Sequence, residues 1–366
     1  MIKVHWFLPT GGDSRRLAGD GASQAGEAVK GQSSHRPATL NYMHQVAAAA
    51  DDLGYDGVLT PTGSQCEDAW VTTAALLAYT RRLKYMVAFR PSQVSPVLAA
   101  QMAATYQHVS GGRLMLNVVT GSADAEAHRY GDWLDKAERY RQTDEFLTVM
   151  RGALSGTPLD FEGEFFNVKG ASIRNLPETL PTIYFGGSSE AAGKVAAKHV
   201  DVYLTWGEPV DAVAEKIEWV RGLAREEGRE IRFGIRMHVI ARDSADDAWE
   251  AANNLLVGVD DEMIQTAQKT LAGRASVGQT RMLELTGGSR DRLVVAPNLW
   301  AGVSLVRGGA GTALVGSHDE IVERMEEYIA VGIEEFVLGG YPHLEEAYWF
   351  AEGAMPRLRS KGLLSD

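Results

Sequence analysis

The sequence has one cysteine, Cys66, among its 366 residues. A single thiol cannot form an intramolecular disulfide, so a disulfide-stabilised secreted domain is excluded and a reducing compartment is favoured. No run of 18 apolar residues occurs, and Met1–Pro9 lacks the long apolar segment of a secretory signal. These absences predict a cytoplasmic protein without a membrane span.

Positive charge is also scarce. Lys and Arg number 36 against 48 Asp and Glu, which gives a formal net charge of −12. Such a chain has no excess of cations to neutralise a phosphate backbone, so no nucleic-acid partner is expected. The nine histidines include no His-Glu-x-x-His pattern, and no metal site is predicted. An apolar fraction of 45% excludes a disordered chain.

Short β-branched runs alternate with helical patterns along the whole chain. The helical patterns include 38–53, the segment after Pro209, and 317–330, where apolar residues recur every three or four positions. Strands are expected at 4–8, 57–60, 83–89, 114–119, 182–185, 202–205, 231–240 and 335–338. Eight strands that alternate with helices predict an α/β fold with one (β/α)8 TIM barrel over 1–366. A doubly wound parallel sheet is the alternative.

Two segments are longer than a barrel requires. Residues 11–37 follow the first strand, and residues 243–330 lie between the seventh and eighth strands. Both insertions are expected at the C-terminal face, where barrel enzymes hold their active sites.

The seventh expected strand carries the clearest chemical signal. Apolar residues alternate there with Arg232, Gly234, Arg236 and His238. This second face points into a barrel, where an unpaired guanidinium is costly. Arg236 and His238 lie near the strand's C-terminal end, so they indicate an anion at the barrel mouth. An internal ion pair, or an edge strand with a wet face, is the alternative.

Other candidate residues follow the expected strands. Arg307 begins a glycine-rich stretch that suits a loop over an anion. Gly187, Ser188 and Ser189 open a helix and suit a phosphate, although no Walker A spacing follows them. Cys66 is either a small buried hydrophobe or a nucleophile. Tyr341 and His343 either reach the barrel mouth or pack in the core.

Several longer motifs resemble those of the flavin-dependent two-component sulfonate monooxygenases in the bacterial-luciferase-like superfamily. They are Trp6-Phe7-Leu8-Pro9-Thr10, Cys66-Glu67-Asp68-Ala69-Trp70, Asn117-Val118-Val119-Thr120-Gly121, Tyr184 to Ser189, Leu204 to Pro209, Arg307 to Leu314 and Gly340 to Ala347. These motifs cover nearly the whole chain in the same order as in that family.

The resemblance implies a luciferase-like TIM barrel that receives reduced FMN (FMNH2) from a separate NAD(P)H-dependent flavin reductase. With O2, such enzymes cleave the C–S bond of an organosulfonate to give sulfite and an aldehyde. A homodimer or a dimer of dimers is implied. Carried over by position, the catalytic residues are Arg236, His238, Arg307 and Tyr341, which together with Trp206 bind the substrate. The implied cofactor contacts are Cys66, Thr120, Tyr140, Gly187, Ser188 and Ser189.

Departures from the family pattern concern the substrate. Ser64-Gln65 stands where alkanesulfonate enzymes often carry Arg-Ser, Gln93 is polar where relatives place an apolar residue, and 11–37 is longer. These features favour a sulfosugar such as sulfoquinovose, which would give 6-oxo-glucose. A pocket for a long alkyl chain would be mostly apolar, which these polar residues do not suit. One alternative is a simple alkanesulfonate of one to about ten carbons. A second is a flavin or F420 oxidoreductase that transfers hydride on the same barrel.

Overall fold

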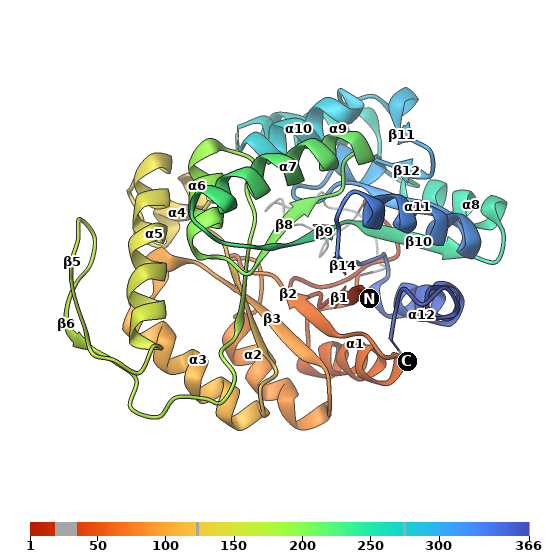
Figure 1. Cartoon of the computed structure of the whole chain (residues 1–366). Helices are drawn as coiled ribbons and strands as arrows, with labels where there is room; N and C mark the ends of the chain where they lie inside the picture. The colour runs from red at the N-terminus through yellow and green to blue at the C-terminus, as the bar shows by residue number, and fades with distance from the viewer. Residues whose placement is uncertain (19–34, 122–123, 274–275, 366) are drawn as a thin grey trace.

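The computed structural model describes residues 1–18, 35–121, 124–273 and 276–365. Eight parallel strands close into a barrel in the order β1-β14-β9-β8-β7-β4-β3-β2 (Figure 1). The strands are β1 (Lys3–Phe7), β2 (Gly57–Thr60), β3 (Lys84–Phe89), β4 (Leu114–Val118), β7 (Thr182–Phe185), β8 (Val202–Trp206), β9 (Arg232–Arg236) and β14 (Glu335–Val337). The predicted (β/α)8 barrel is confirmed.

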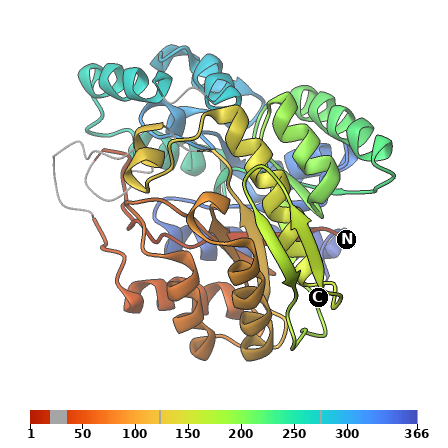
Figure 2. The same ribbon diagram turned by 90° about the vertical axis from the view of Figure 1, so that its left-hand side faces the viewer.

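Helices surround the barrel and bury their apolar stripes against it (Figures 1 and 2). They are α1 (Leu40–Leu53), α2 (Ala69–Leu76), α3 (Pro96–Ser110), α5 (Lys136–Ala153), α6 (Glu190–His199), α7 (Val210–Glu226), α11 (His318–Ala330) and α12 (His343–Ser360). Local sequence fixes their ends: Thr39 caps α1 by accepting a bond from the Tyr42 amide, and Gly54 ends it at a φ of 87°. None of the described helices is long and apolar enough to cross a membrane.

The seventh expected strand is divided in two, which corrects the prediction of one strand over 231–240. β9 ends at Arg236, and after Met237 the chain continues as β10 (His238–Arg242) in a second sheet. β10 pairs there with β13 (Ala313–Ser317), and the His238 amide donates to the Thr312 carbonyl at 2.8 Å. The strand leaves the barrel because the insertion supplies this new partner.

The insertion after β10 forms a layer at one end of the barrel. It contains α8 (Ala245–Leu255), α9 (Asp261–Ala272), α10 (Val277–Thr286), β11 (Val294–Ala296) and β12 (Leu299–Trp300) before β13. It has its own apolar cluster, which includes Leu17 from the other insertion. Most of that other insertion, residues 19–34 of 11–37, lies outside the described residues. A hairpin of β5 (Leu159–Glu162) and β6 (Asn167–Ala171), which the sequence did not predict, extends away from the barrel (Figure 1).

A buried carboxylate neutralises the inward face of β9 at its N-terminal end. Glu335 in β14 ion-pairs with Arg232, and it accepts hydrogen bonds from the Tyr184 hydroxyl at 2.6 Å and His5 Nε2 at 3.0 Å. Burial acts to raise the pKa of Glu335, but the His5, Tyr184 and Arg232 contacts outweigh it and lower the pKa to about 2. The sequence left an internal ion pair as the alternative to an anion site on this strand. Arg232 forms such a pair with Glu335.

We expect Glu335→Gln to lower the free energy of unfolding by about 2 kcal/mol at neutral pH, because it weakens the buried hydrogen bonds from His5 and Tyr184 and removes the counterion of the partly exposed Arg232. The pKa of Glu335 is lower in the folded protein than in the unfolded chain. Its contribution is therefore present above about pH 4.5 and is lost as the pH falls toward 2. Urea unfolding of wild type and variant at pH 7 and pH 3.5 measures both effects. An equal difference at the two pH values would contradict this account.

Candidate active site

A cavity of about 430 Å³ lies at the carboxyl ends of the barrel strands. Its walls come from the ends of β1, β2, β3, β4, β8 and β9, from α10, and from the loop before β13. Eight of the predicted site residues line it together: Cys66, Thr120, Tyr140, Trp206, Arg236, His238, Arg307 and Tyr341. The barrel's C-terminal face, which the sequence predicted for the site, therefore holds these side chains.

Arg236 is a buried cation without an acidic partner in the part of the chain that the structure describes. Its Nη1 donates to the Met237 carbonyl at 2.6 Å, and its guanidinium lies 4.7 Å from the centre of the Phe7 ring. Burial lowers the pKa of Arg236 to about 10, so the side chain stays charged at neutral pH. A charged group held in this way favours an anionic ligand.

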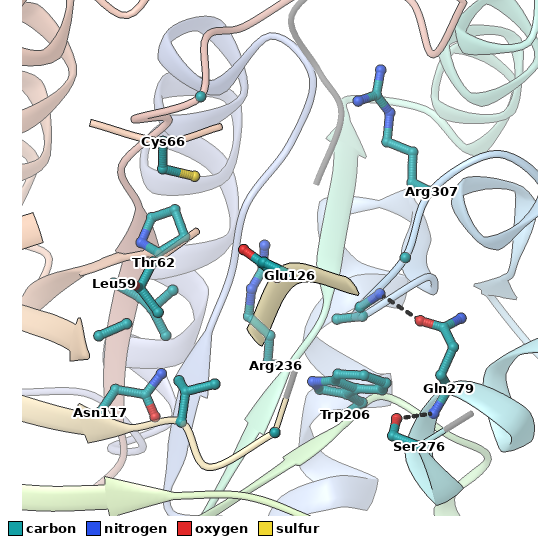
Figure 3. A pocket seen from close by; sticks show the side chains of 18 of the residues that line it. Leu59, Thr62, Cys66, Asn117, Glu126, Trp206, Arg236, Ser276, Gln279 and Arg307 are labelled. Atoms are coloured by element: carbon teal, nitrogen blue, oxygen red, sulfur yellow. Dashed lines mark hydrogen bonds between the residues drawn. The ribbon is translucent and has the colours of Figure 1, made fainter. Parts of the chain in front are cut away.

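Arg307 lines the same cavity without meeting Arg236 (Figure 3). Its Nη2 donates to the Leu17 carbonyl at 3.0 Å, and its guanidinium lies 5.3 Å from the Tyr341 ring centre. Its Nε and Nη1 are buried and have no hydrogen-bond partner among the described residues. The sequence did not indicate that Arg307 joins the two insertions through Leu17.

His238 is buried beside both cations, and its ring lies 5.2 Å from that of Tyr341. Burial, the charge of Arg236, the neighbouring His343 and the charge of Arg307 lower the pKa of His238 well below its ordinary value. An unperturbed imidazole titrates near neutrality. The buried His238 ring is instead neutral at physiological pH, because burial and the neighbouring cations oppose its protonation.

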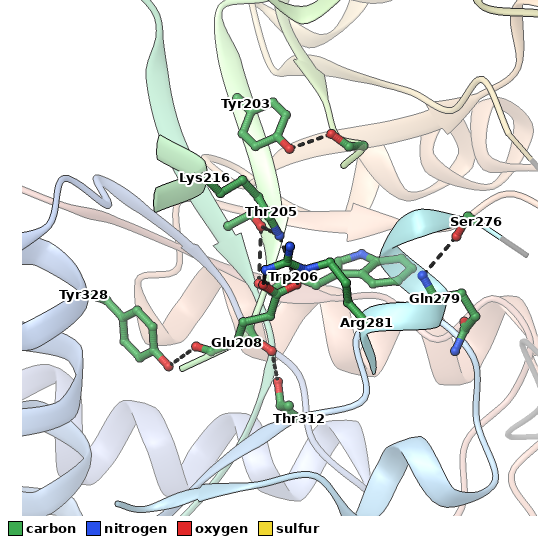
Figure 4. Close-up of polar contacts among 12 residues, drawn as sticks. Tyr203, Thr205, Trp206, Glu208, Lys216, Ser276, Gln279, Arg281, Thr312 and Tyr328 are labelled. Carbon is green, nitrogen blue, oxygen red and sulfur yellow. Dashed lines mark hydrogen bonds and ion pairs between the residues drawn. The ribbon is translucent and has the colours of Figure 1, made fainter. Parts of the chain in front are cut away.

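An ionic network lies beside Trp206, the cavity residue at the end of β8 (Figure 4). Glu208 accepts bonds from Lys216 in α7 at 3.0 Å and from Arg281 in α10 at 2.6 Å. A β-carbon built on Gly278 would lie 3.3 Å from the Trp206 ring, so α10 packs closely on the indole. The network therefore fixes α10 against the wall of the cavity.

Gly187, Ser188 and Ser189 do not line the cavity but lie directly beside it. Ser189 caps α6 by accepting a bond from the Ala192 amide at 3.3 Å. A β-carbon on Gly187 would lie 3.5 Å from the Tyr140 hydroxyl, and one on Gly278 would lie 3.8 Å from Ser188 Oγ. The structure thus places these three residues next to Tyr140 and α10.

Sequence reasoning missed several polar residues of the cavity wall. Arg90 pairs with Glu126 at 3.0 Å, and Arg139 pairs with Asp132 at 3.1 Å. Nε and Nη1 of Arg90 and Nη2 of Arg139 are buried and unpartnered within the described ranges. The other missed residues include Asn117 and Gln279, whereas His343, which the sequence left between the barrel mouth and the core, lines the cavity. Asn117 had a usable signal, since it is a polar residue inside a buried strand.

Cys66 lies in the cavity wall as a thiol. Burial raises its pKa, and the neighbouring Glu126 raises it further, against bonding to Thr10 and the charge of Arg90. A raised pKa disfavours the thiolate that nucleophilic catalysis requires.

We expect Cys66→Ala to keep flavin-dependent turnover within about threefold of wild type, because Cys66 acts as a packing group. Turnover is measured at saturating reduced FMN, alongside a titration of flavin binding. Complete loss of turnover in a folded variant that still binds flavin would show that the thiol takes part in the chemistry.

The luciferase-like monooxygenase family matches the chain over residues 2–335. The chain therefore belongs to this family of flavin-dependent monooxygenases. Its fold is similar to that of a riboflavin lyase solved with a modified FMN and riboflavin, at a TM-score of 0.82 and 19% identity over 100% of this chain and 93% of that one. A long-chain alkane monooxygenase matches at a TM-score of 0.79 and 19% identity, over 100% of this chain and 92% of that one. An F420-dependent secondary alcohol dehydrogenase matches at a TM-score of 0.67 and 19% identity, over 96% of this chain and 98% of that one.

Proposed function

We propose that this enzyme uses reduced FMN and O2 to desulfonate an organosulfonate, releasing sulfite and an aldehyde. The observation that carries the proposal is Arg236, a buried guanidinium that faces the cavity with no acidic partner in the described chain. A sulfonate is an anion at every physiological pH and accepts the paired hydrogen bonds of a guanidinium. Arg307, the Trp206 indole and the Tyr341 hydroxyl are further donors in the same wall.

The cavity residues fit a bound flavin. Buried, unpartnered donors of Arg90 and Arg139 at one side suit an anionic cofactor. Thr120, Tyr140 and Cys66 would contact the flavin, and Gly187, Ser188 and Ser189 would contact its phosphate at the start of α6. The bound reduced flavin supplies the electrons that activate O2. A separate NAD(P)H-dependent flavin reductase would deliver it.

A polyhydroxylated sulfonate such as sulfoquinovose is the substrate that we favour. Thr62, Gln65, Asn117 and Gln279 line the cavity, and a pocket for a long alkyl chain would be mostly apolar. Gln93 does not contribute to this preference, because it is exposed at the end of a short 3-10 helix and is not among the cavity residues. A simple alkanesulfonate is the second candidate.

Hydride transfer to or from F420 is the competing chemistry, because that cofactor serves an enzyme of the same fold. Two buried cations in the wall favour a sulfonate substrate over this chemistry, since hydride transfer does not require an anion beside the flavin.

The deciding experiment is a screen for sulfite release with reduced FMN supplied by a reductase. The panel contains alkanesulfonates of different lengths, a taurine-like aminosulfonate and sulfoquinovose. We expect release from sulfoquinovose with the highest kcat/KM. Higher kcat/KM for alkanesulfonates would change the substrate class, and no sulfite from any sulfonate would reject the proposal.

A further inference from the structure

An acid–imidazole pair lies at the cavity, outside the residues assigned so far: His343 lines the wall, and Asp13, which is not a lining residue, bonds to it. Asp13 Oδ1 is 2.9 Å from Nδ1 of His343, and the two side chains are 0% and 2% exposed. Asp13 lies in the segment after β1, whereas His343 is the first residue of α12. The His343 ring packs 5.2 Å from Phe7 and 5.1 Å from Tyr341, centre to centre. The fold therefore builds this pair from two ends of the chain.

The hydrogen bonds of Asp13 fix the tautomer of His343. The carboxylate accepts from the Ser14 amide at 2.8 Å, from the His343 amide at 2.7 Å and from the Tyr42 hydroxyl. Burial acts to raise the pKa of Asp13, but His343 and Tyr42 outweigh it and lower the pKa. An ionised carboxylate only accepts hydrogen bonds, so Nδ1 of His343 carries the proton. In the neutral imidazole, Nε2 then has a free lone pair.

No donor within the described structure bonds to that lone pair. Nε2 of His343 is buried and lacks a hydrogen-bond partner among the described residues, while the residue itself lines the cavity. A buried acceptor beside a ligand cavity, oriented through its other nitrogen by a carboxylate, has the arrangement of a general base.

We infer that His343 accepts the proton that leaves the carbon bearing the sulfonate, and that Asp13 is its positioning residue. The inference rests on the proposed desulfonation. In that reaction one C–H bond and the C–S bond break, and a C=O bond forms. Two electrons from the substrate and two from reduced FMN reduce O2, whose atoms end in the aldehyde and in water. Sulfite leaves, and the C–H proton moves to Nε2.

The surroundings favour His343 over His238 for this role. His238 has no carboxylate partner in the described chain and lies beside Arg236 and Arg307, so an imidazolium there would be repelled. His343 stands at the N-terminus of α12, whose dipole also opposes a cation. The full negative charge of Asp13 at 2.9 Å outweighs that partial charge. His238 remains a neutral hydrogen-bonding group for the substrate.

The tautomer can be tested in flavin-free protein. We expect nitrogen NMR of protein labelled in histidine to show His343 with a protonated Nδ1 and an unprotonated Nε2. The signals are assigned by their loss in His343→Gln. Asp13→Asn should convert the ring to a mixture of tautomers, because an amide can donate to Nδ1 as well as accept from it. A wild-type His343 protonated on Nε2 would overturn the inference.

Kinetics with a sulfonate deuterated at the carbon bearing sulfur test the proton transfer. We expect His343→Gln to lower kcat about 100-fold or more, to change KM little and to increase the deuterium isotope effect on kcat. Unchanged kcat in folded His343→Gln would refute the inference. If Asp13→Asn fails to fold, the wild-type NMR spectrum and His343→Gln still decide.

His199→Gln is the matched control. His199 is also buried and bonds to an acid, Asp144, at 2.5 Å, but it lies on α6 and is not a cavity residue. It should keep wild-type kcat and isotope effect, and an equal loss there would show that the His343 effect is structural.

A wild-type enzyme that releases no sulfite from any sulfonate would reject the proposed function. The tautomer of His343 is measured without flavin or substrate, so that result would remain valid.

Discussion

Arg236→Lys is expected to lower kcat/KM for sulfite release by about 100-fold or more, while reduced FMN still binds. Arg236 is the cavity cation whose charge no described acid neutralises, and its planar fork is fixed by the Met237 carbonyl and the Phe7 ring. Lysine keeps the charge but presents a single ammonium that cannot form two parallel bonds to one sulfonate. Sulfite release and a flavin-binding titration measure the two expectations.

Arg232→Lys is the matched control for this substitution. Arg232 lies four residues earlier on the inward face of the same strand, but its partner is Glu335 and it is not a cavity residue. We expect its sulfite release to stay close to wild type. Near-wild-type release by Arg236→Lys would remove Arg236 from the substrate site, and equal losses in both variants would indicate damage to β9.

Arg307→Ala is expected to lower kcat/KM for sulfite release by about 10- to 100-fold and to raise hydrogen peroxide formed per reduced FMN oxidised. Arg307 spans from the loop before β13 to the Leu17 carbonyl and covers the Tyr341 ring. Its removal takes a donor from the sulfonate and opens the cavity wall to water, which diverts activated oxygen to peroxide.

Oxygen uptake, peroxide and sulfite measured in one reaction give the yield of each product. Arg290→Ala serves as the control, because Arg290 belongs to the same insertion but bonds to the Val259 carbonyl and is not a cavity residue. An Arg307→Ala variant with an unchanged ratio of sulfite to peroxide would make Arg307 a residue that only joins the two insertions.

The barrel was predictable from the sequence because its signals are local. Each strand is a short β-branched run, and each helix carries an apolar stripe between caps such as Thr39 and Gly54. Arg236 was found for the same reason, since alternation along 231–236 assigns it to the inward face. Local patterns also indicated Arg307 and Tyr341, and motifs shared with a known family supplied Trp206, but local patterns could not place these three residues in one cavity.

Only the tertiary structure decided which charges are neutralised. Arg232 and Arg236 look alike in the sequence, yet Glu335 reaches one of them and no described acid reaches the other, because β14 lies next to β9 in the closed barrel. The division between β9 and β10 at Met237 likewise depends on β13, which pairs with β10 and begins about 76 residues after Met237. The contact of Asp13 with His343 joins residues 330 positions apart, and pairing at that separation leaves no trace in local periodicity.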